Sequence, residues 1–201
     1  MKKILPLFSY FFHPLFIPVL TLVYFFILDE NILVPAEKYL LLIQVVIVTI
    51  LIPISFYFLL RSLGKIDSVM AHETRERKAP LILHAILIYL LLRQSTAFDM
   101  IPELYYFFLG VLLSTIAALV LVFLKTKVSL HMMGMGGFLF FIIGLGIHNR
   151  LNVVNLAAFW MLITGLTGSS RLAMGAHDTK ELMFGFFFGL LPQVALWYFW
   201  L

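Results

Sequence analysis

The sequence contains no cysteine and few charged residues, and these two absences exclude whole classes of protein. Without cysteine there is no disulfide framework, no thiolate nucleophile and no zinc site with thiolate ligands. Charged residues make up 12% of the 201 residues, about half of the roughly 25% found in an average soluble domain. Because 63% of the residues are hydrophobic, the composition predicts an integral membrane protein.

The net charge of +4 comes from small basic clusters that lie beside apolar segments. Such clusters suit membrane lipids with anionic headgroups or a phosphate-bearing substrate. A continuous basic track of the kind that binds nucleic acid is missing, so we expect no nucleic-acid partner.

Long apolar runs predict the membrane spans when the sequence is read with a window of about 19 residues. The runs are 4–28, 39–60, 80–92, 101–124, 132–147, 151–168 and 182–201. The run 80–92 is short for a span, so its helix should begin upstream among charged residues. The expected fold is an all-α polytopic transmembrane helix bundle with about six to seven spans, forming a single transmembrane domain over residues 1–201.

The first apolar run contains three prolines, Pro6, Pro14 and Pro18. Proline lacks a backbone N–H, so this run predicts a kinked or broken helix whose free carbonyl groups bind neighbouring helices. His13 lies among these prolines and is interpreted as a partly buried packing residue. In the last run Gly185 and Gly189 form a GxxxG pattern, which favours close contact between helices.

With seven crossings, three polar segments lie on the same side of the membrane as the N-terminus. These segments are 61–78, 125–130 and 169–180. They hold nearly all the residues capable of chemistry, so we expect them to converge on one pocket at the membrane surface.

The segment around residue 177 carries the strongest chemical pattern. His177 and Glu181 are four residues apart, so on a helix they would share a face and the carboxylate would accept a hydrogen bond from the imidazole. Arg171 can hold two phosphate oxygens. The start of the last helix should also offer free N–H groups and the positive end of its dipole. The segment therefore predicts binding and transfer of a phosphate group.

The other two segments have simpler interpretations when each is taken alone. Arg75, Arg77 and Lys78 are typical of a solvated loop. Ser129 could be a helix N-cap, with His131 a polar interface residue just after it.

Taken together, the three segments resemble the membrane branch of the type 2 phosphatidic-acid phosphatase superfamily, whose motifs are K-x6-R-P, P-S-G-H and S-R-x5-H-x3-D. Ser170, Arg171, His177 and Glu181 match the third motif, with glutamate in place of aspartate. The second motif keeps its serine and histidine but has lost its proline and glycine.

The first motif is degenerate. Counting back from Pro80 puts Ala79 where the motif has arginine and His72 where it has lysine. Arg75, Arg77 and Lys78 could supply the missing charge, and the three remain alternatives.

The resemblance implies a metal-independent phosphohydrolase without a cofactor. In this family the histidine that matches His177 attacks phosphorus, the carboxylate that matches Glu181 orients it, and the histidine that matches His131 protonates the leaving group. Cations and hydroxyl groups hold the phosphate oxygens, and the candidates are Arg171, Ser129, Ser170, Arg75, Arg77, Lys78 and Lys127. Because the chain is apolar, the expected substrate is a lipid phosphate or a polyprenyl pyrophosphate.

Three other functions compete with this interpretation. The altered first and second motifs are compatible with a catalytically silent member of the same fold that binds lipid or acts as a scaffold. An intramembrane serine protease would use Ser169 or Ser170, but it would leave Arg171 and Glu181 without a role. A metal-dependent enzyme built on His177 and Glu181, or on His72 and Glu73, lacks a third ligand at convincing spacing.

The distribution of lysine and arginine predicts the orientation in the cytoplasmic membrane. Eleven lie on the side of the expected site and three, Lys38, Arg93 and Arg150, lie opposite. The eleven are Lys2, Lys3, Arg61, Lys65, Arg75, Arg77, Lys78, Lys125, Lys127, Arg171 and Lys180. This bias favours a cytoplasmic active site, with His148 and Asp99 at the other surface.

Overall fold

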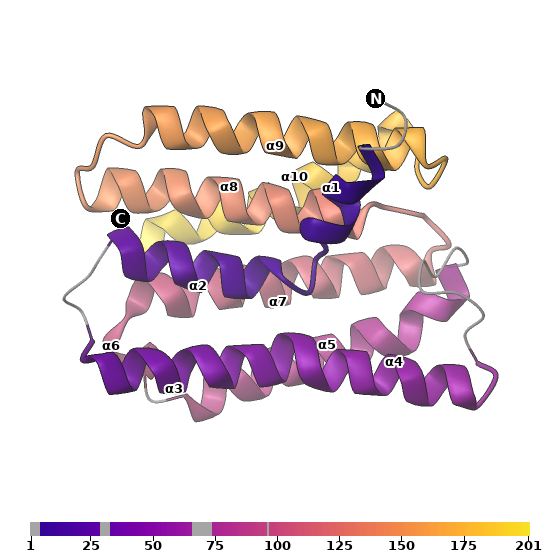
Figure 1. Ribbon diagram of the computed structural model, residues 1–201, viewed down its shortest axis with the longest axis horizontal. Helices are drawn as coiled ribbons and strands as arrows, with labels where there is room; N and C mark the ends of the chain where they lie inside the picture. The colour runs from indigo at the N-terminus through magenta and orange to yellow at the C-terminus, as the bar shows by residue number, and fades with distance from the viewer. Residues whose placement is uncertain (1–4, 29–32, 66–73, 96) are drawn as a thin grey trace. The chain divides into compact units, whose positions relative to one another are not determined.

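The fold is known from a computed structural model that describes residues 5–28, 33–65, 74–95 and 97–201. These residues form helices joined by short connections, without a strand among them (Figure 1). The predicted all-α class is therefore confirmed. The chain divides into two compact units. Unit 1 comprises Met1–Ile17 and Val128–Leu201, and unit 2 comprises Pro18–Lys127.

Unit 1 combines the N-terminal helix with the C-terminal part of the chain. Its helices are α1 (Leu5–Phe11), α8 (Leu130–His148), α9 (Val154–Ala173), α10 (Thr179–Leu196) and the short η3 (Trp197–Phe199). Helices α8 and α9 run antiparallel side by side, α10 packs along α8, and α1 lies against α9 (Figure 1). The N-terminal helix α1 thus joins three consecutive C-terminal helices in one bundle.

Aromatic rings hold α1 to this bundle. Trp160 of α9 is buried and packs edge-on against Phe138 of α8, with ring centroids 4.7 Å apart. Phe12, just after α1, packs edge-on against the same indole at 5.8 Å. Edge-to-face contacts of this kind stabilise a core beyond the burial of their area. Trp160 therefore ties α1, α8 and α9 together.

The backbones of α8 and α10 approach each other closely where α10 has glycine. Gly185 lies against the backbone of Ser129, and Gly189 lies against the backbone of Met133. A methyl group at either glycine would overlap a carbonyl oxygen of the facing segment. The close helix contact that the GxxxG pattern predicts is therefore present, since small residues let two helices pack backbone to backbone.

The connection from α9 to α10 is a sharp turn made possible by glycine. Gly175 has a φ of +60°, a left-handed conformation that favours glycine. The amide of Ala176 donates to the carbonyl of Arg171 over 3.1 Å, and the amide of Gly175 donates to Leu172 over 2.9 Å. This pair of bonds is a Schellman motif, which closes α9 and reverses the chain. Arg171 and His177 consequently lie on either side of one tight turn.

Unit 2 contains the middle of the chain. Its helices are α2 (Ile17–Leu28, which begins at the last residue of unit 1), α3 (Pro35–Val46), the π-helical turn η1 (Ile47–Leu51), α4 (Ile52–Ser62), η2 (Thr74–Arg77), α5 (Lys78–Gln94), α6 (Ala97–Met100) and α7 (Pro102–Phe123). Helices α5 and α7 pack against each other. The elements α3, η1 and α4 form one continuous helix. The wider π-helical turn η1 lies just before Pro53, which has no N–H to bond to the preceding turn.

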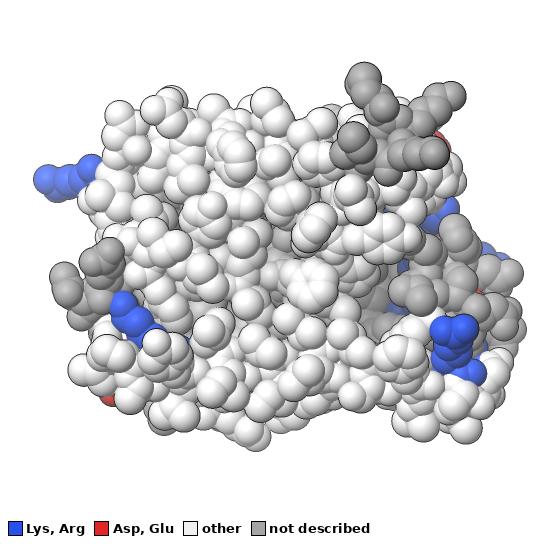
Figure 2. All heavy atoms as spheres, viewed as in Figure 1, with Lys and Arg blue, Asp and Glu red and all other residues white. Residues whose placement is uncertain are grey.

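Within the described residues, four helices are long and apolar enough to cross a membrane, and they indicate a membrane protein. They are Pro35–Ser62, Pro102–Phe123, Leu130–His148 and Thr179–Phe199. On the face drawn in Figure 2, lysine and arginine gather near the ends of helices, and the middle of the helices is uncharged. The count of seven crossings stays a prediction.

Two local predictions are confirmed. The first apolar run is broken, since α1 ends at Phe11 and α2 begins at Ile17 with Pro14 in the turn between them. The helix of the short run 80–92 begins upstream, at Lys78.

The contact between α8 and α10 generates a stability prediction. Gly189→Ala should destabilise the protein by about 1–3 kcal/mol, because the added methyl overpacks a backbone contact. Gly165→Ala is the matched control, since Gly165 lies within α9 with open space around the position of a β-carbon. It should leave stability unchanged or raise it by up to about 1 kcal/mol. Thermal unfolding in detergent measures both, and equal melting temperatures for the two variants would contradict the contact.

Candidate active site

His177 and Glu181 form the short hydrogen bond that the sequence predicts, but His177 lies in the connecting segment and not in the helix. Nδ1 of His177 donates to Oε2 of Glu181 over 2.7 Å. The prediction that both residues share a helical face is wrong, because His177 precedes the helix and α10 begins only at Thr179. The imidazole therefore approaches Glu181 from the connecting segment. Since Nδ1 carries the hydrogen in this bond, the neutral ring has its lone pair on Nε2.

The first turn of α10 explains this geometry. Asp178 is the N-cap, and its Oδ1 accepts the amide hydrogen of Glu181 over 2.8 Å. Oε2 of Glu181 in turn accepts the amide hydrogen of Asp178 over 3.4 Å. This reciprocal pair is a capping box. One carboxylate oxygen of Glu181 thus serves both the helix start and the His177 ring.

The capping box bears on a second prediction, that the start of α10 offers free N–H groups to a phosphate. The side chains of Asp178 and Glu181 engage the amides of Glu181 and Asp178. Binding of an anion by the amides of Thr179 and Lys180 stays a prediction. Two acidic side chains lie at the positive end of this helix and oppose a further negative group there.

The start of α8 is attached directly to the start of α10. The amide of Ser129 donates to the main-chain carbonyl of Glu181 over 3.1 Å. Ser129 is the N-cap of α8, as its sequence pattern predicts, and its Oγ accepts from the amide of Met132 over 3.4 Å. Ser129 is fully buried. Its two bonds therefore fix where His131, the second residue of α8, stands relative to His177.

His131 is held by a residue from the N-terminal helix. Its Nε2 lies 3.0 Å from the main-chain oxygen of Ser9. A carbonyl oxygen only accepts, so Nε2 of His131 carries the hydrogen. The side chain of Ser9 lies 2.6 Å from Oγ of Ser170, and both hydroxyl groups are buried. Ser9 thus links α1 to α8 and to α9, a role that no sequence pattern predicted.

Arg171 supplies the positive charge of this cluster. It lies in the last turn of α9 and is 3% exposed. Its charge is close enough to act electrostatically on His13 and on His131, and His177 also acts on His131. Unit 1 therefore brings together Arg171, His131, His177 and Glu181, as predicted, and adds His13 and Ser9.

The predicted basic residues of the first two motifs lie in unit 2. Arg75 and Arg77 belong to η2, Arg77 is buried, and Lys78 opens α5. The ammonium group of Lys78 stands 4.6 Å from the centre of the Phe123 ring, a cation–π contact. Lys127 is half-buried.

His72 and Glu73 lie outside the described residues. Within the described part of the chain, no three histidine, aspartate or glutamate side chains are grouped closely enough to hold a metal ion. His84 is paired in unit 2, where its Nδ1 lies 3.2 Å from Oγ1 of Thr115. His148 lies at the other end of α8 from His131, where its ring is tilted against that of Trp200 with centroids 5.6 Å apart.

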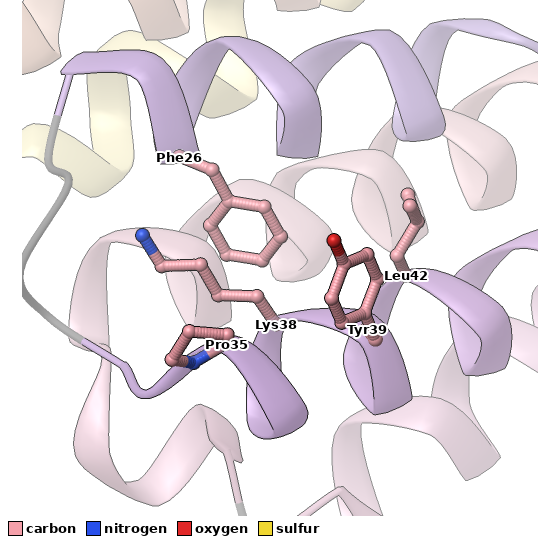
Figure 3. Close-up of a pocket in the computed structure, with 5 residues that line it drawn as sticks. All are labelled: Phe26, Pro35, Lys38, Tyr39 and Leu42. Carbon is pink, nitrogen blue, oxygen red and sulfur yellow. The ribbon is translucent and has the colours of Figure 1, made fainter.

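A shallow groove also exists in unit 2. It has a volume of about 210 Å³ and is lined by Phe26, Pro35, Lys38, Tyr39 and Leu42. Figure 3 shows Lys38 extended past Phe26, and its ammonium group lies 5.5 Å from the ring centre. None of the predicted site residues lines this groove, so the cluster in unit 1 is the candidate active site.

Comparison with known proteins does not extend this picture: no protein-family model, curated protein or solved structure matches the chain.

The double role of Glu181 makes a testable prediction. Glu181→Gln can keep the capping box, because glutamine also serves at this position, but it removes the negative acceptor beside Nδ1. We expect Glu181→Gln to shift the His177 tautomer away from Nδ1–H and to leave the melting temperature nearly unchanged. Nitrogen-15 NMR of histidine-labelled protein at about pH 8.5, above the usual range of imidazole protonation, reports the tautomer.

Glu181→Asp serves as the control for charge against length. It should preserve the tautomer if the shorter side chain still reaches the ring. An unchanged His177 spectrum in Glu181→Gln would mean that Glu181 acts on the helix alone.

Proposed function

We propose that this protein is an integral-membrane, metal-independent phosphatase that hydrolyses a lipid phosphate or a polyprenyl pyrophosphate through a phosphohistidine intermediate. The observation that carries the proposal is the 2.7 Å bond between His177 and Glu181 in a cluster that also holds His131 and Arg171. An oriented imidazole, a second imidazole and a permanent cation are the groups that phosphoryl transfer requires. The resemblance of the three sequence segments to the type 2 phosphatidic-acid phosphatases supports the same assignment.

The first half of the reaction follows from the hydrogen bonds of the two histidines. Nε2 of His177 attacks phosphorus, and the bond from phosphorus to the leaving oxygen breaks. Glu181 stabilises the positive charge that forms on the His177 ring. Because Nε2 of His131 is bonded to Ser9, protonated His131 gives its Nδ1 hydrogen to the leaving oxygen. His131 is then neutral and keeps its bond to Ser9.

The second half regenerates the enzyme. Nδ1 of His131 takes a proton from water, and the resulting hydroxide attacks the phosphorus of phosphohistidine. The bond from phosphorus to His177 breaks, inorganic phosphate leaves, and His131 is protonated again. Arg171 stabilises the negative charge on the equatorial oxygens in both halves. No metal ion or cofactor takes part in either step.

The remaining phosphate contacts are assigned from the resemblance. Arg75, Arg77, Lys78 and Lys127 are the candidates for further positive charge. The two serine hydroxyl groups of the motifs contribute less than the pattern predicts, because Ser129 caps α8 and Ser170 pairs with Ser9. Arg171 therefore carries more of the phosphate charge in this protein.

The surroundings favour a lipid substrate. Unit 1 places the cluster at the ends of α8, α9 and α10, and two of these helices are apolar enough to span a membrane. A phosphate group at the end of such helices can be reached while an acyl or prenyl chain stays in the hydrocarbon. The bias of lysine and arginine favours the cytoplasmic side of the cytoplasmic membrane.

A second function is favoured by one observation. The start of α10 is closed by Asp178 and Glu181, and negative groups at that point oppose binding of a phosphate. A catalytically silent relative that binds lipid would tolerate this arrangement. Release of inorganic phosphate separates the two functions.

The proposal predicts the effects of two substitutions. Purified protein should release phosphate from a mixture of phosphatidic acid, phosphatidylglycerol phosphate, sphingoid phosphates and polyprenyl pyrophosphates. His177→Ala should abolish the release, since the phosphohistidine cannot form without this imidazole. His131→Ala should lower kcat by about 10² to 10⁴, the range for a positioned general acid.

His148→Ala is the control, because His148 lies at the opposite end of α8. Full activity of His177→Ala would disprove the mechanism. Absence of phosphate release by the wild-type protein from every lipid tested would favour the silent relative.

A further inference from the structure

Among the described residues, His13 is a histidine of the cluster to which neither the mechanism nor the family motifs give a role. It lies in the turn between α1 and α2, within unit 1, and is half-buried. Its ring stands edge-on to the ring of His131, with centroids 5.1 Å apart and planes at 84°. Arg171 is near enough to act electrostatically on both rings. His13 therefore belongs to the same polar cluster as the proposed catalytic residues.

A local hydrogen bond sets which nitrogen of His13 can donate. The main-chain amide of Leu15 donates to Nδ1 of His13 over 3.3 Å. A nitrogen that accepts a hydrogen bond carries no hydrogen, so the hydrogen of the neutral ring is on Nε2. Pro14, between these two residues, restricts the turn, and the bond from the amide of Phe16 to the carbonyl of His13 over 2.9 Å closes it. The turn thus holds His13 as a hydrogen-bond donor with a fixed orientation.

The chemistry that suits this donor is an oxyanion. Arg171 offers a permanent positive charge near His13. The Nδ1 atom of His13 accepts from the amide of Leu15, and the Nδ1 atom of His177 donates to Glu181, so neither nitrogen can donate to a bound anion. The acidic side chains of Asp178 and Glu181 oppose an anion at the start of α10, so an anion next to Arg171 is better served by N–H donors from other segments. Nε2 of His13 is such a donor.

We propose, on the basis of the phosphatase function above, that His13 is a further substrate-binding residue, which donates its Nε2–H to an oxygen of the phosphate group beside Arg171. The turn between α1 and α2 then forms part of the phosphate site. It adds a donor to a site in which the hydroxyl groups of Ser129 and Ser170 already have partners and two acidic side chains cap α10.

Binding of inorganic vanadate tests this role without relying on turnover. Affinity is measured by isothermal titration on the full-length protein in detergent. His13→Phe keeps an aromatic ring beside His131 but removes the donor, and it should weaken vanadate binding about 10- to 100-fold, the usual loss for a hydrogen bond to a charged group. His13→Gln carries an N–H close to the position of Nε2 and should bind within about threefold of the wild type. His148→Phe is the control and should bind like the wild type.

A second pair of variants covers the case in which His13→Phe does not fold. The amide of His13→Asn reaches only the position of Nδ1, so His13→Gln should bind vanadate at least about tenfold more tightly than His13→Asn. Equal affinities of these two variants, or wild-type affinity in a folded His13→Phe protein, would overturn the role of His13.

Vanadate binding tests the role of His13 separately from the proposed phosphatase function. Wild-type protein that releases phosphate while His13→Phe binds vanadate normally would leave the phosphatase intact and disprove the inference. Wild-type protein that binds no vanadate would also disprove it, whatever the phosphate-release assay shows.

Discussion

The backbone contact between α8 and α10 is the constraint on which the site in unit 1 depends. Gly185 and Gly189 allow the start of α10 to lie against Ser129 and Met133 without an intervening side chain. The amide of Ser129 can then reach the carbonyl of Glu181. The two histidine-bearing segments are therefore fixed to each other by main-chain atoms, which move less than side chains. A catalytic pair needs this kind of rigid support, because small displacements of reacting groups cost large factors in rate.

Stability and chemistry share the same atoms at the start of α10. Oε2 of Glu181 caps the helix through Asp178 and orients His177. The Schellman motif at Gly175 places His177 next to that helix start while leaving Arg171 in the last turn of α9. These two local motifs, a helix end and a helix start, bring Arg171 and His177 together within a short connection. The cluster is consequently built from ordinary helix-terminus interactions.

Much of the fold follows from hydropathy alone. Apolar runs located the helices, Pro14 predicted the break in the first run, and the short run 80–92 correctly implied a helix starting among charges, at Lys78. Local spacing also predicted the bond between His177 and Glu181. The prediction that His177 lies within the helix was wrong. The pattern Asp178-x-x-Glu181 is a sequence signal for a helix start, and α10 begins just after Asp178. That signal places His177 outside the helix and puts two acidic side chains at the start of α10.

Other parts of the site could not be read from the sequence. Ser9 and His13 lie in an apolar run that looks like any membrane helix, and their partners are more than a hundred residues away. Ser9 reaches Ser170 and His131 only because Trp160 and its aromatic neighbours hold α1 against α9. Such contacts depend on tertiary packing, which periodicity and motif spacing do not encode. The division into two units, with the N-terminal helix joined to the C-terminal helices, is likewise a property of the folded chain.

The central claim is that His177 forms a covalent bond to phosphorus, and trapping that bond tests it most directly. The protein would be mixed with a lipid substrate labelled with phosphorus-32, quenched rapidly in alkali and digested. Phosphohistidine survives alkali and is lost in acid, so the account predicts a protein-bound label with this stability, located by mass spectrometry on the peptide that contains His177. A substrate that is hydrolysed at a normal rate with no label on the protein, or with the label on another residue, would contradict the account.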